Sequence, residues 1–193
     1  MPRTSEPPVE PFGADLQPAV EIHDGLVLRP FERGDVDVVR AAFNDVDIMR
    51  WHHFRIDSDD EAIEWIDQTL GNWMAGTAAH WLIESEGRGV GRICLHVDAE
   101  RATGEIAYWL LPVGRGSGAA TRAAHWVTNW GHGRGIHRIV LQHGATNRAS
   151  CAVADRLGYA AEGVARGAEF HDGVWSDVHL HAHLSTDPLL AFD

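Results

Sequence analysis

One stretch of the sequence limits the fold more than any other. A strand-like run over residues 104–111 stops at Pro112, a glycine-rich turn follows, and residues 119–130 have the composition of a helix. A second strand-like run, 136–142, comes after that helix. A strand–helix–strand unit of this length implies two parallel strands joined by a right-handed crossover. The chain is therefore expected to be an α/β protein.

The remaining patterns predict further strands and helices around this unit. Apolar runs separated by glycine-containing turns indicate neighbouring antiparallel strands, and apolar residues spaced three and four apart indicate helices. The expected strands cover residues 25–30, 79–83, 89–97, 163–168 and 174–184. The expected helices cover residues 35–43, 59–75 and 148–157. The prediction is one mixed, mostly antiparallel sheet flanked by helices.

The 193 residues suit one domain with tails. Five of the eight prolines lie within residues 1–18. Because proline fixes φ and removes a backbone donor, this segment is expected to be a disordered arm. The domain then covers residues 19–184, and residues 185–193 form a tail.

Net charge and cysteine content limit which partners and which cellular compartment are expected. A net charge of −12 argues against nucleic-acid binding and suits a cationic substrate. The two cysteines, Cys94 and Cys151, have no metal-like spacing, so reduced thiols and a cytoplasmic location are expected. No apolar run is long enough for a membrane helix, and no secretory signal is apparent, so no membrane partner is expected.

The turn itself predicts an anion site. Gly114, Gly116 and Gly118 let backbone N–H groups point inward at a helix N-terminus, where a phosphate or pyrophosphate binds well. Arg115 either contacts that anion or braces the loop. No Gly-Lys-Ser/Thr follows, so this is not a P-loop, and the acidic residue of a dinucleotide fingerprint is missing. A plain strand-to-helix connection is the alternative.

The motifs together resemble one family. Residues 115–120 fit the pattern Arg/Gln-x-x-Gly-x-Gly/Ala, the acyl-CoA pyrophosphate loop of the GNAT superfamily of N-acetyltransferases. Its ribosomal-protein N-terminal acetyltransferase (RimJ/RimL-type) branch has an Asn-x-x-Ser turn similar to residues 147–150. Leu-Gly-Tyr at 157–159 and the hairpin at 170–178 also resemble that branch. The similar motifs keep the family's order over residues 26–184.

The resemblance implies the fold and the donor. In the family two sheet strands splay apart and hold the pantetheine arm of acyl-CoA between them. Acetyl-CoA is the default co-substrate, and no metal takes part. Main-chain bonds to pantetheine are expected from Leu111 and Val113, with Asn147 also reaching the arm. The pyrophosphate is expected at Arg115, Gly116, Ser117, Gly118, Ala119, Ala120 and Thr121. Gly114 and Ser117 replace the family's usual aromatic and basic residues.

Acyl transfer to an amine needs a base and an acid for the departing thiolate. The tyrosine acid of some family members is replaced by Ala154, so Ser150 is our candidate donor, with a helix-capping role as its alternative. Glu169 resembles the acidic residue before the branch's closing hairpin and is the candidate base. Glu105 is the rival base, and a water relay is the third option.

The acceptor is expected to be a primary amine of a small molecule or of a protein N-terminus. The family covers its acceptor pocket with the region between the first helices, which here contains Trp51, His52, His53 and Phe54. A non-catalytic CoA-binding module on the same fold is the alternative function, and turnover with any amine discriminates the two. Dimerisation is common in the branch, so a homodimer is one expected assembly.

Two further features suggest other chemistry. His179, His181 and His183 alternate, so they share one face of a strand, as metal ligands do. We see no cysteine or clustered carboxylate that completes such a site, and the resembled branch uses no metal, so none is expected. Cys151 lies at a helix N-terminus, which favours a thiolate, but a small buried thiol fits it better than an acyl-cysteine intermediate.

Overall fold

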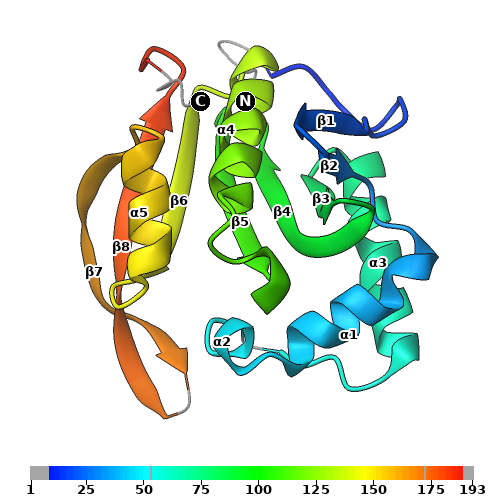
Figure 1. Cartoon of the computed structure of the whole chain (residues 1–193). Coiled ribbons are helices and arrows are strands. Elements are labelled where there is room, and N and C mark those ends of the chain that lie inside the picture. The colour runs from blue at the N-terminus through cyan, green and yellow to red at the C-terminus, as the bar shows by residue number, and fades with distance from the viewer. Residues whose placement is uncertain (1–8, 53, 172, 189–193) are drawn as a thin grey trace, which may run out of the picture.

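The structure is a computed structural model that describes residues 9–52, 54–171 and 173–188. The predicted acceptor residue His53, residues 1–8 of the predicted arm and residues 189–193 of the predicted tail lie outside the described residues. Within the described residues one sheet has the strand order β1-β2-β3-β4-β5-β6-β8-β7 (Figure 1). Its strands are β1 Val20–His23, β2 Leu26–Arg29, β3 Ala78–Ser85, β4 Arg88–Asp98, β5 Thr103–Leu110, β6 Arg138–Gly144, β7 Ala160–His171 and β8 Val174–Leu184.

Two neighbouring strands of the sheet, β5 and β6, separate toward one end. β5 and β6 form the one parallel pair of this sheet, as the strand–helix–strand pattern predicted, and the other neighbours are antiparallel. Their pairing ends at Ile106 opposite Leu141, although β5 continues to Leu110 and β6 to Gly144. The two strands therefore diverge beyond this point. The predicted fold class, a mixed, mostly antiparallel, splayed sheet flanked by helices, is confirmed.

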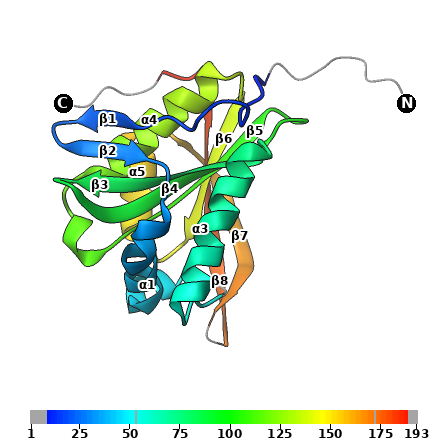
Figure 2. The same ribbon diagram turned by 90° about the vertical axis from the view of Figure 1, so that its right-hand side faces the viewer.

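Helices cover both faces of the sheet. They are α1 Val36–Asn44, α2 Val46–Met49, α3 Asp59–Met74, α4 Ala119–Gly133 and α5 Arg148–Arg156, with short 3-10 helices η1 Arg33–Asp35 and η2 Pro112–Gly114. α4 and α5 lie on one face, and α1 and α3 on the other (Figures 1 and 2). Alternation along β3 supplies both cores, because Trp81 faces the α4 side and Leu82 the α1 side. In the part of the chain described, no helix is long and apolar enough to cross a membrane.

Residues 9–18 correct the predicted disordered arm. Phe12 is only 8% exposed, and its ring packs 5.0 Å from Trp73 and 5.6 Å from Trp130, centroid to centroid. The Trp81 Nε1 also donates to a carbonyl of this segment at 3.0 Å. The prolines do prevent helix and strand here, but aromatic burial holds the segment against the ends of α3 and α4. We call residues 9–18 the N-terminal strap.

Candidate active site

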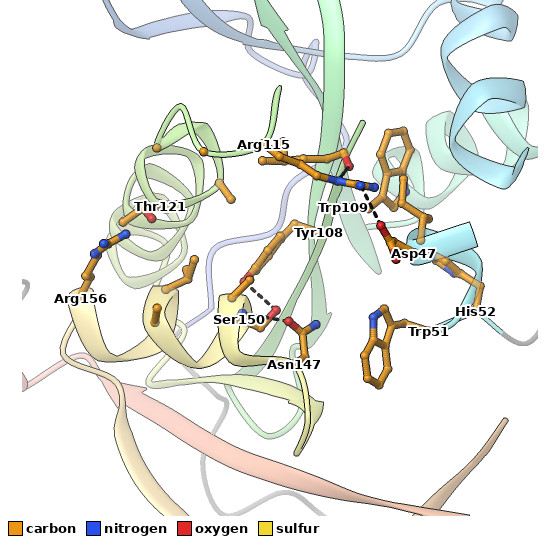
Figure 3. Close-up of a pocket in the computed structure, with 18 residues that line it drawn as sticks. Asp47, Trp51, His52, Tyr108, Trp109, Arg115, Thr121, Asn147, Ser150 and Arg156 are labelled. Atoms are coloured by element: carbon orange, nitrogen blue, oxygen red, sulfur yellow. Dashed lines mark hydrogen bonds and ion pairs between the residues drawn. The ribbon is translucent and has the colours of Figure 1, made fainter. Parts of the chain in front are cut away.

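A cavity of about 460 Å³ lies where β5 and β6 diverge. Its size is in the range of small-molecule and cofactor sites. Figure 3 shows its lining, which comes from α2 and the turn after it, from the end of β5, from the glycine-rich turn with α4, and from α5. The lining residues are Asp47, Ile48, Trp51, His52, Tyr108, Trp109, Leu110, Arg115, Gly116, Gly118, Ala120, Thr121, Asn147, Ala149, Ser150, Ala152, Val153 and Arg156.

The glycine-rich turn forms the upper end of this cavity. Gly116 and Gly118 have φ values of +76° and +81°, which side chains other than glycine's rarely adopt. Gly118 is also the N-cap of α4 and offers no side chain to the first-turn amides. Ala120 and Thr121 of that first turn line the cavity. The first turn of α4 thus lies at this end of the cavity, and the unbonded backbone N–H groups of a helix N-terminus suit an anion.

The departures from the family pattern have a steric and a bonding reason. A Cβ at Gly114 would lie 3.0 Å from both the Cβ and the carbonyl oxygen of Val90, so β4 leaves little room for the family's aromatic. The Ser117 hydroxyl donates to the Gly114 carbonyl at 2.8 Å and accepts from the Ala119 amide at 3.3 Å. Ser117 thus fastens the turn to itself, and the anion site depends on backbone rather than on these side chains.

Arg115 braces the turn against α2, which is one of its two predicted roles, and because it also lines the cavity its contact with an anion stays a prediction. Its guanidinium lies 3.1 Å from an Asp47 oxygen (Figure 3). It also lies 2.6 Å from an Asp45 oxygen, and the Arg115 Nε donates to the Leu110 carbonyl. Asp45 also caps α2 by accepting from the Asp47 and Ile48 amides. Burial pushes the pKa of Asp45 up, but the Ile48 amide and the Arg115 guanidinium outweigh it, so the net shift is downward.

Two arginines that the sequence patterns did not single out flank the anion site. Arg156 of α5 lines the cavity beside Thr121 (Figure 3). Arg122 donates to the Ser117 carbonyl at 3.2 Å, and its Nε is buried without a hydrogen-bond partner among the described residues. Arg122 lies four residues after Gly118, on the same face of the helix, and this spacing is the signal that would have found it.

Register at the open strand edge corrects one prediction. The Leu111 amide donates to the Val90 carbonyl at 2.9 Å, so it bonds β4 and is not free for pantetheine. Because successive backbone groups of a strand point to opposite sides, those of Leu110 and Tyr108 face the gap instead. Val113 lies in η2 with a 69% exposed side chain, and neither it nor Leu111 lines the cavity. The contacts predicted at Leu111 and Val113 are therefore expected three residues earlier, at Tyr108 and Leu110.

Ser150 lies at the centre of a hydrogen-bonded chain. The Tyr108 hydroxyl donates to Ser150 Oγ at 3.0 Å, and the Ser150 amide donates to Asn147 Oδ1 at 3.1 Å (Figure 3). Asn147 is therefore the cap of α5, and Ser150 is free of that role. Burial raises the pKa of Tyr108 to about 12, so this phenol stays protonated at neutral pH. Since Ser150 accepts from Tyr108, its own hydrogen remains available to the cavity.

Neither predicted carboxylate base lines the cavity. Glu105 is exposed on β5 and borders a separate depression with His96 and Arg138. Glu169 lies on β7 opposite Ser176, in the β7–β8 hairpin. Their catalytic roles stay predictions. The ionisable groups that the structure does bring to the acceptor side include His52, which the sequence marked only as a binding residue.

The turn after α2 forms one wall of the cavity. Trp51 and His52 line this wall, and their role in acceptor binding stays a prediction. Trp51 packs against Gly144 of β6, where an added Cβ would come within 2.1 Å of the indole ring. Phe54 is 49% exposed, packs on Phe43 at 5.1 Å between centroids, and does not line the cavity.

The splayed sheet, the glycine-rich helix N-terminus and the adjoining cavity have the arrangement that the motif resemblance implied for an N-acetyltransferase. The chain belongs to the acetyltransferase (GNAT) domain family, whose profile matches residues 25–160. This confirms the family that the motifs resemble. No curated protein matches the chain by sequence.

Solved structures show the same fold at low identity. A RimL ribosomal L7/L12 α-N-protein acetyltransferase in complex with coenzyme A has a TM-score of 0.82 at 21% identity, covering 86% of this chain and 98% of its own. The microcin C7 self-immunity acetyltransferase MccE, in complex with acetyl-CoA and AMP, has 0.78 at 21%, covering 84% and 94%. A ribosomal-protein-S5-alanine acetyltransferase from Vibrio fischeri has 0.79 at 19%, covering 88% and 97%.

Proposed function

We propose that the protein transfers an acyl group, acetyl by default, from acyl-CoA to the primary amine of a peptide N-terminus or a small molecule. The observation that carries this proposal is one cavity that joins a backbone anion site to an unpaired strand edge. A pyrophosphate and an amide-containing arm need these two features side by side. The complexes of RimL with coenzyme A and of MccE with acetyl-CoA support the choice of donor.

The donor then has a defined direction in the cavity. Its pyrophosphate lies at the first turn of α4, where Arg122 and Arg156 add positive charge. Its pantetheine arm follows the open edge of β5 at Leu110 and Tyr108, adding to the sheet as an extra strand would. The side-chain NH₂ of Asn147 is available to the arm, because only its oxygen is used in capping. This direction brings the thioester toward Ser150.

Direct attack of the amine on the thioester requires one group that donates a proton and one that accepts a proton, and residues of this chain supply both. The amine nitrogen forms a bond to the thioester carbon, the carbon–sulfur bond breaks, and the thiolate needs a proton. Ser150 donates that proton, while the Tyr108 hydroxyl stabilises the serine oxygen that remains. The ammonium form of the acceptor must first lose a proton. His52 is our nearest candidate for that base, and Glu169 acts through water as the alternative.

The acceptor is a cationic amine in this proposal. The net charge of −12 and the Asp47 carboxylate on the cavity wall favour approach of a positive group. RimL and the Vibrio fischeri protein are acetyltransferases of ribosomal proteins, which supports a peptide N-terminus as one acceptor to test. Small amines are the other, and both belong in the first screen.

Binding is tested first, by thermal shift with acetyl-CoA, longer acyl-CoAs, CoA and NAD. A ligand of the native state raises the melting temperature by mass action. Gly116→Ala and Gly87→Ala are a matched pair, because both glycines have open space around them and φ values of +76° and +74°. We expect about tenfold weaker acetyl-CoA binding, or about 1.4 kcal/mol, in Gly116→Ala only. Folded protein that no CoA species stabilises would overturn the proposal.

Turnover is tested second, by thiol release and product mass with a panel of peptides and small amines. Loss of turnover in Ser150→Ala with acetyl-CoA binding retained supports the proton-donor role. A missing alkaline-rising limb in the pH–rate profile of His52→Gln, but not of Glu169→Gln, identifies the base. Binding of acetyl-CoA with no turnover on any amine would favour the non-catalytic module instead.

A further inference from the structure

A cluster of metal-ligating side chains lies on α5 and the strands beneath it. His143 comes from β6, His179 and His181 from β8, and Cys151 from α5. One ligand atom of each residue lies within 4.8 Å of those of the other three. His143 and His181 are buried, and the other two are half-buried. Segments far apart in the sequence thus bring three imidazoles and a thiol to one point.

Sheet register explains why the three imidazoles meet. His143 and His179 are directly opposite in the antiparallel β6–β8 pair, and His181 is two residues further along β8, so all three share one face. The ring centroids of His143 lie 5.3 Å from His179 and 5.2 Å from His181. α5 packs over this face of the sheet through Val153, and Cys151 is in its first turn.

The buried nitrogens are prepared for a ligand. His143 Nδ1 lies 2.9 Å from the Gly144 carbonyl oxygen, which only accepts, so Nδ1 carries the hydrogen and Nε2 carries the lone pair. That Nε2 is buried without a hydrogen-bond partner in the described chain, and so is Nδ1 of His181. Unpaired buried nitrogens are unfavourable. Metal-bound histidines commonly donate their other N–H to a backbone carbonyl, as His143 does.

The cluster corrects the sequence-based view of this strand. We found no cysteine to complete a site on His179, His181 and His183, yet Cys151 adjoins the first two. His183 is outside the set, because its Nδ1 lies 3.0 Å from His132 Nε2. The pairing of β6 with β8 adds His143 in its place.

We propose that His143, Cys151, His179 and His181 form a zinc site. Three imidazole nitrogens and one thiolate suit this metal, which prefers four ligands in a tetrahedron. Bond lengths of about 2.0–2.3 Å place tetrahedral ligand atoms about 3.3–3.8 Å apart, so contraction from the present spacing by small side-chain rotations closes the site. On binding, the Cys151 S–H releases its proton to solvent and the thiolate sulfur bonds the metal.

The place of the site in the fold gives it a structural role. Four protein ligands leave no open position for substrate, as in structural zinc sites. The metal would tie the first turn of α5 to β6 and β8, just beyond the point where β5 and β6 separate. Ser150 and Ala152, on either side of Cys151, line the large cavity. The metal therefore stabilises the helix that carries the proposed proton donor, and this inference stands whether or not the protein proves to be active.

The test uses the full chain without a histidine tag, freed of metal by chelator and dialysis. Cobalt(II) is the probe, because a tetrahedral site gives intense visible bands and a cysteine ligand adds a thiolate charge-transfer band. We expect one cobalt per chain, both spectral features, displacement by zinc, and a rise in melting temperature with zinc. Zinc content after refilling is measured by mass spectrometry of the element.

Matched variants identify the ligands. Cys151→Ser loses the charge-transfer band while Cys94→Ser, at the other cysteine of the chain, keeps it. His181→Ala weakens cobalt binding by more than the about 10–100-fold that loss of an outer-shell partner costs, whereas His23→Ala at an exposed site does not. Circular dichroism without metal checks that each variant is folded. Folded wild-type protein with no charge-transfer band, or with binding that Cys151→Ser leaves unchanged, would overturn the site.

Discussion

The N-terminal strap yields a quantitative prediction through Phe12. Its side chain is 8% exposed and packs between Trp73 and Trp130. Replacing a buried phenylalanine by alanine costs about 3–5 kcal/mol. We expect a loss of about 3 kcal/mol, at the low end of this range, because the strap lies at the edge of the core and can relax into the cavity that the substitution leaves. For a domain of this size each kcal/mol shifts the melting temperature by about 2–4 °C, so Phe12→Ala should lower it by about 6–12 °C.

The assay is thermal and urea unfolding followed by circular dichroism, with tryptophan emission as a second probe. Leu16→Ala is the matched control, because Leu16 belongs to the same strap and is 95% exposed. Its effect should stay within about 0.5 kcal/mol. If Phe12→Ala melts with the wild type and with Leu16→Ala, the strap contributes nothing to the core, and the disordered arm that the prolines predicted is the better description.

Three further predictions concern the cavity and the Asp45–Arg115 ion pair beside it. Gly144→Ala puts a Cβ 2.1 Å from the Trp51 ring, so acceptor KM should rise about tenfold, or about 1.4 kcal/mol, with acetyl-CoA binding unchanged; steady-state kinetics checks both. Tyr108→Phe removes a hydrogen bond worth about 1 kcal/mol, so kcat should fall several-fold at constant acetyl-CoA KM in a thiol-release assay; an unaltered kcat would contradict it. The folded protein lowers the pKa of Asp45, so the ionised carboxylate stabilises the fold at pH values above its ordinary pKa of about 3.9. This stabilisation is lost as the pH falls through the lowered pKa of the folded state. Asp45→Asn should therefore cost up to about 1 kcal/mol at neutral pH, through the Arg115 pair, and nothing in strong acid, by urea unfolding at each pH.

Most of the fold was predictable because its signals are local. The strand–helix–strand pattern around the glycine-rich turn required a parallel pair, and β5–β6 is that pair. Among the strands and α-helices of the described chain, β1 and α2 were not predicted, and each is only four residues long. β2 is equally short, but the proline directly after it marked its end. β1 and α2 depend instead on pairing with β2 and on the Asp45 cap, which a four-residue pattern does not reveal.

The strap shows where a local rule stops. Prolines exclude regular structure, and residues 9–18 indeed form no helix or strand. They do not exclude order, which here comes from the burial of Phe12 among aromatic rings of two distant helices. Composition alone gave no indication of that contact, because both tryptophans are far away in the sequence.

The glycine-rich turn of the proposed donor site could be predicted, but the register of the strand before it could not. Alternation along β5 divides its backbone groups into two sets, yet only pairing with β4 decides which set is used. The bond from the Leu111 amide to Val90 makes that choice and leaves Leu110 toward the gap. The bracing partners of Arg115 could not be read from the sequence either, because Asp47 and Asp45 lie 68 and 70 residues away.

The histidines on β8 are the clearest case of information that only tertiary structure holds. A period of two correctly placed His179, His181 and His183 on one face. The neighbours of each histidine are set by the strand that pairs with β8 and by the helix that packs over it, and these neighbours differ from one end of β8 to the other. At its inner end His183 contacts His132 of α4. At its outer end His179 and His181 contact His143 of β6 and Cys151 of α5. A sequence row of identical residues thus separates into a helix-packing contact and the proposed ligand set, and the cobalt spectrum of Cys151→Ser reports on the second alone.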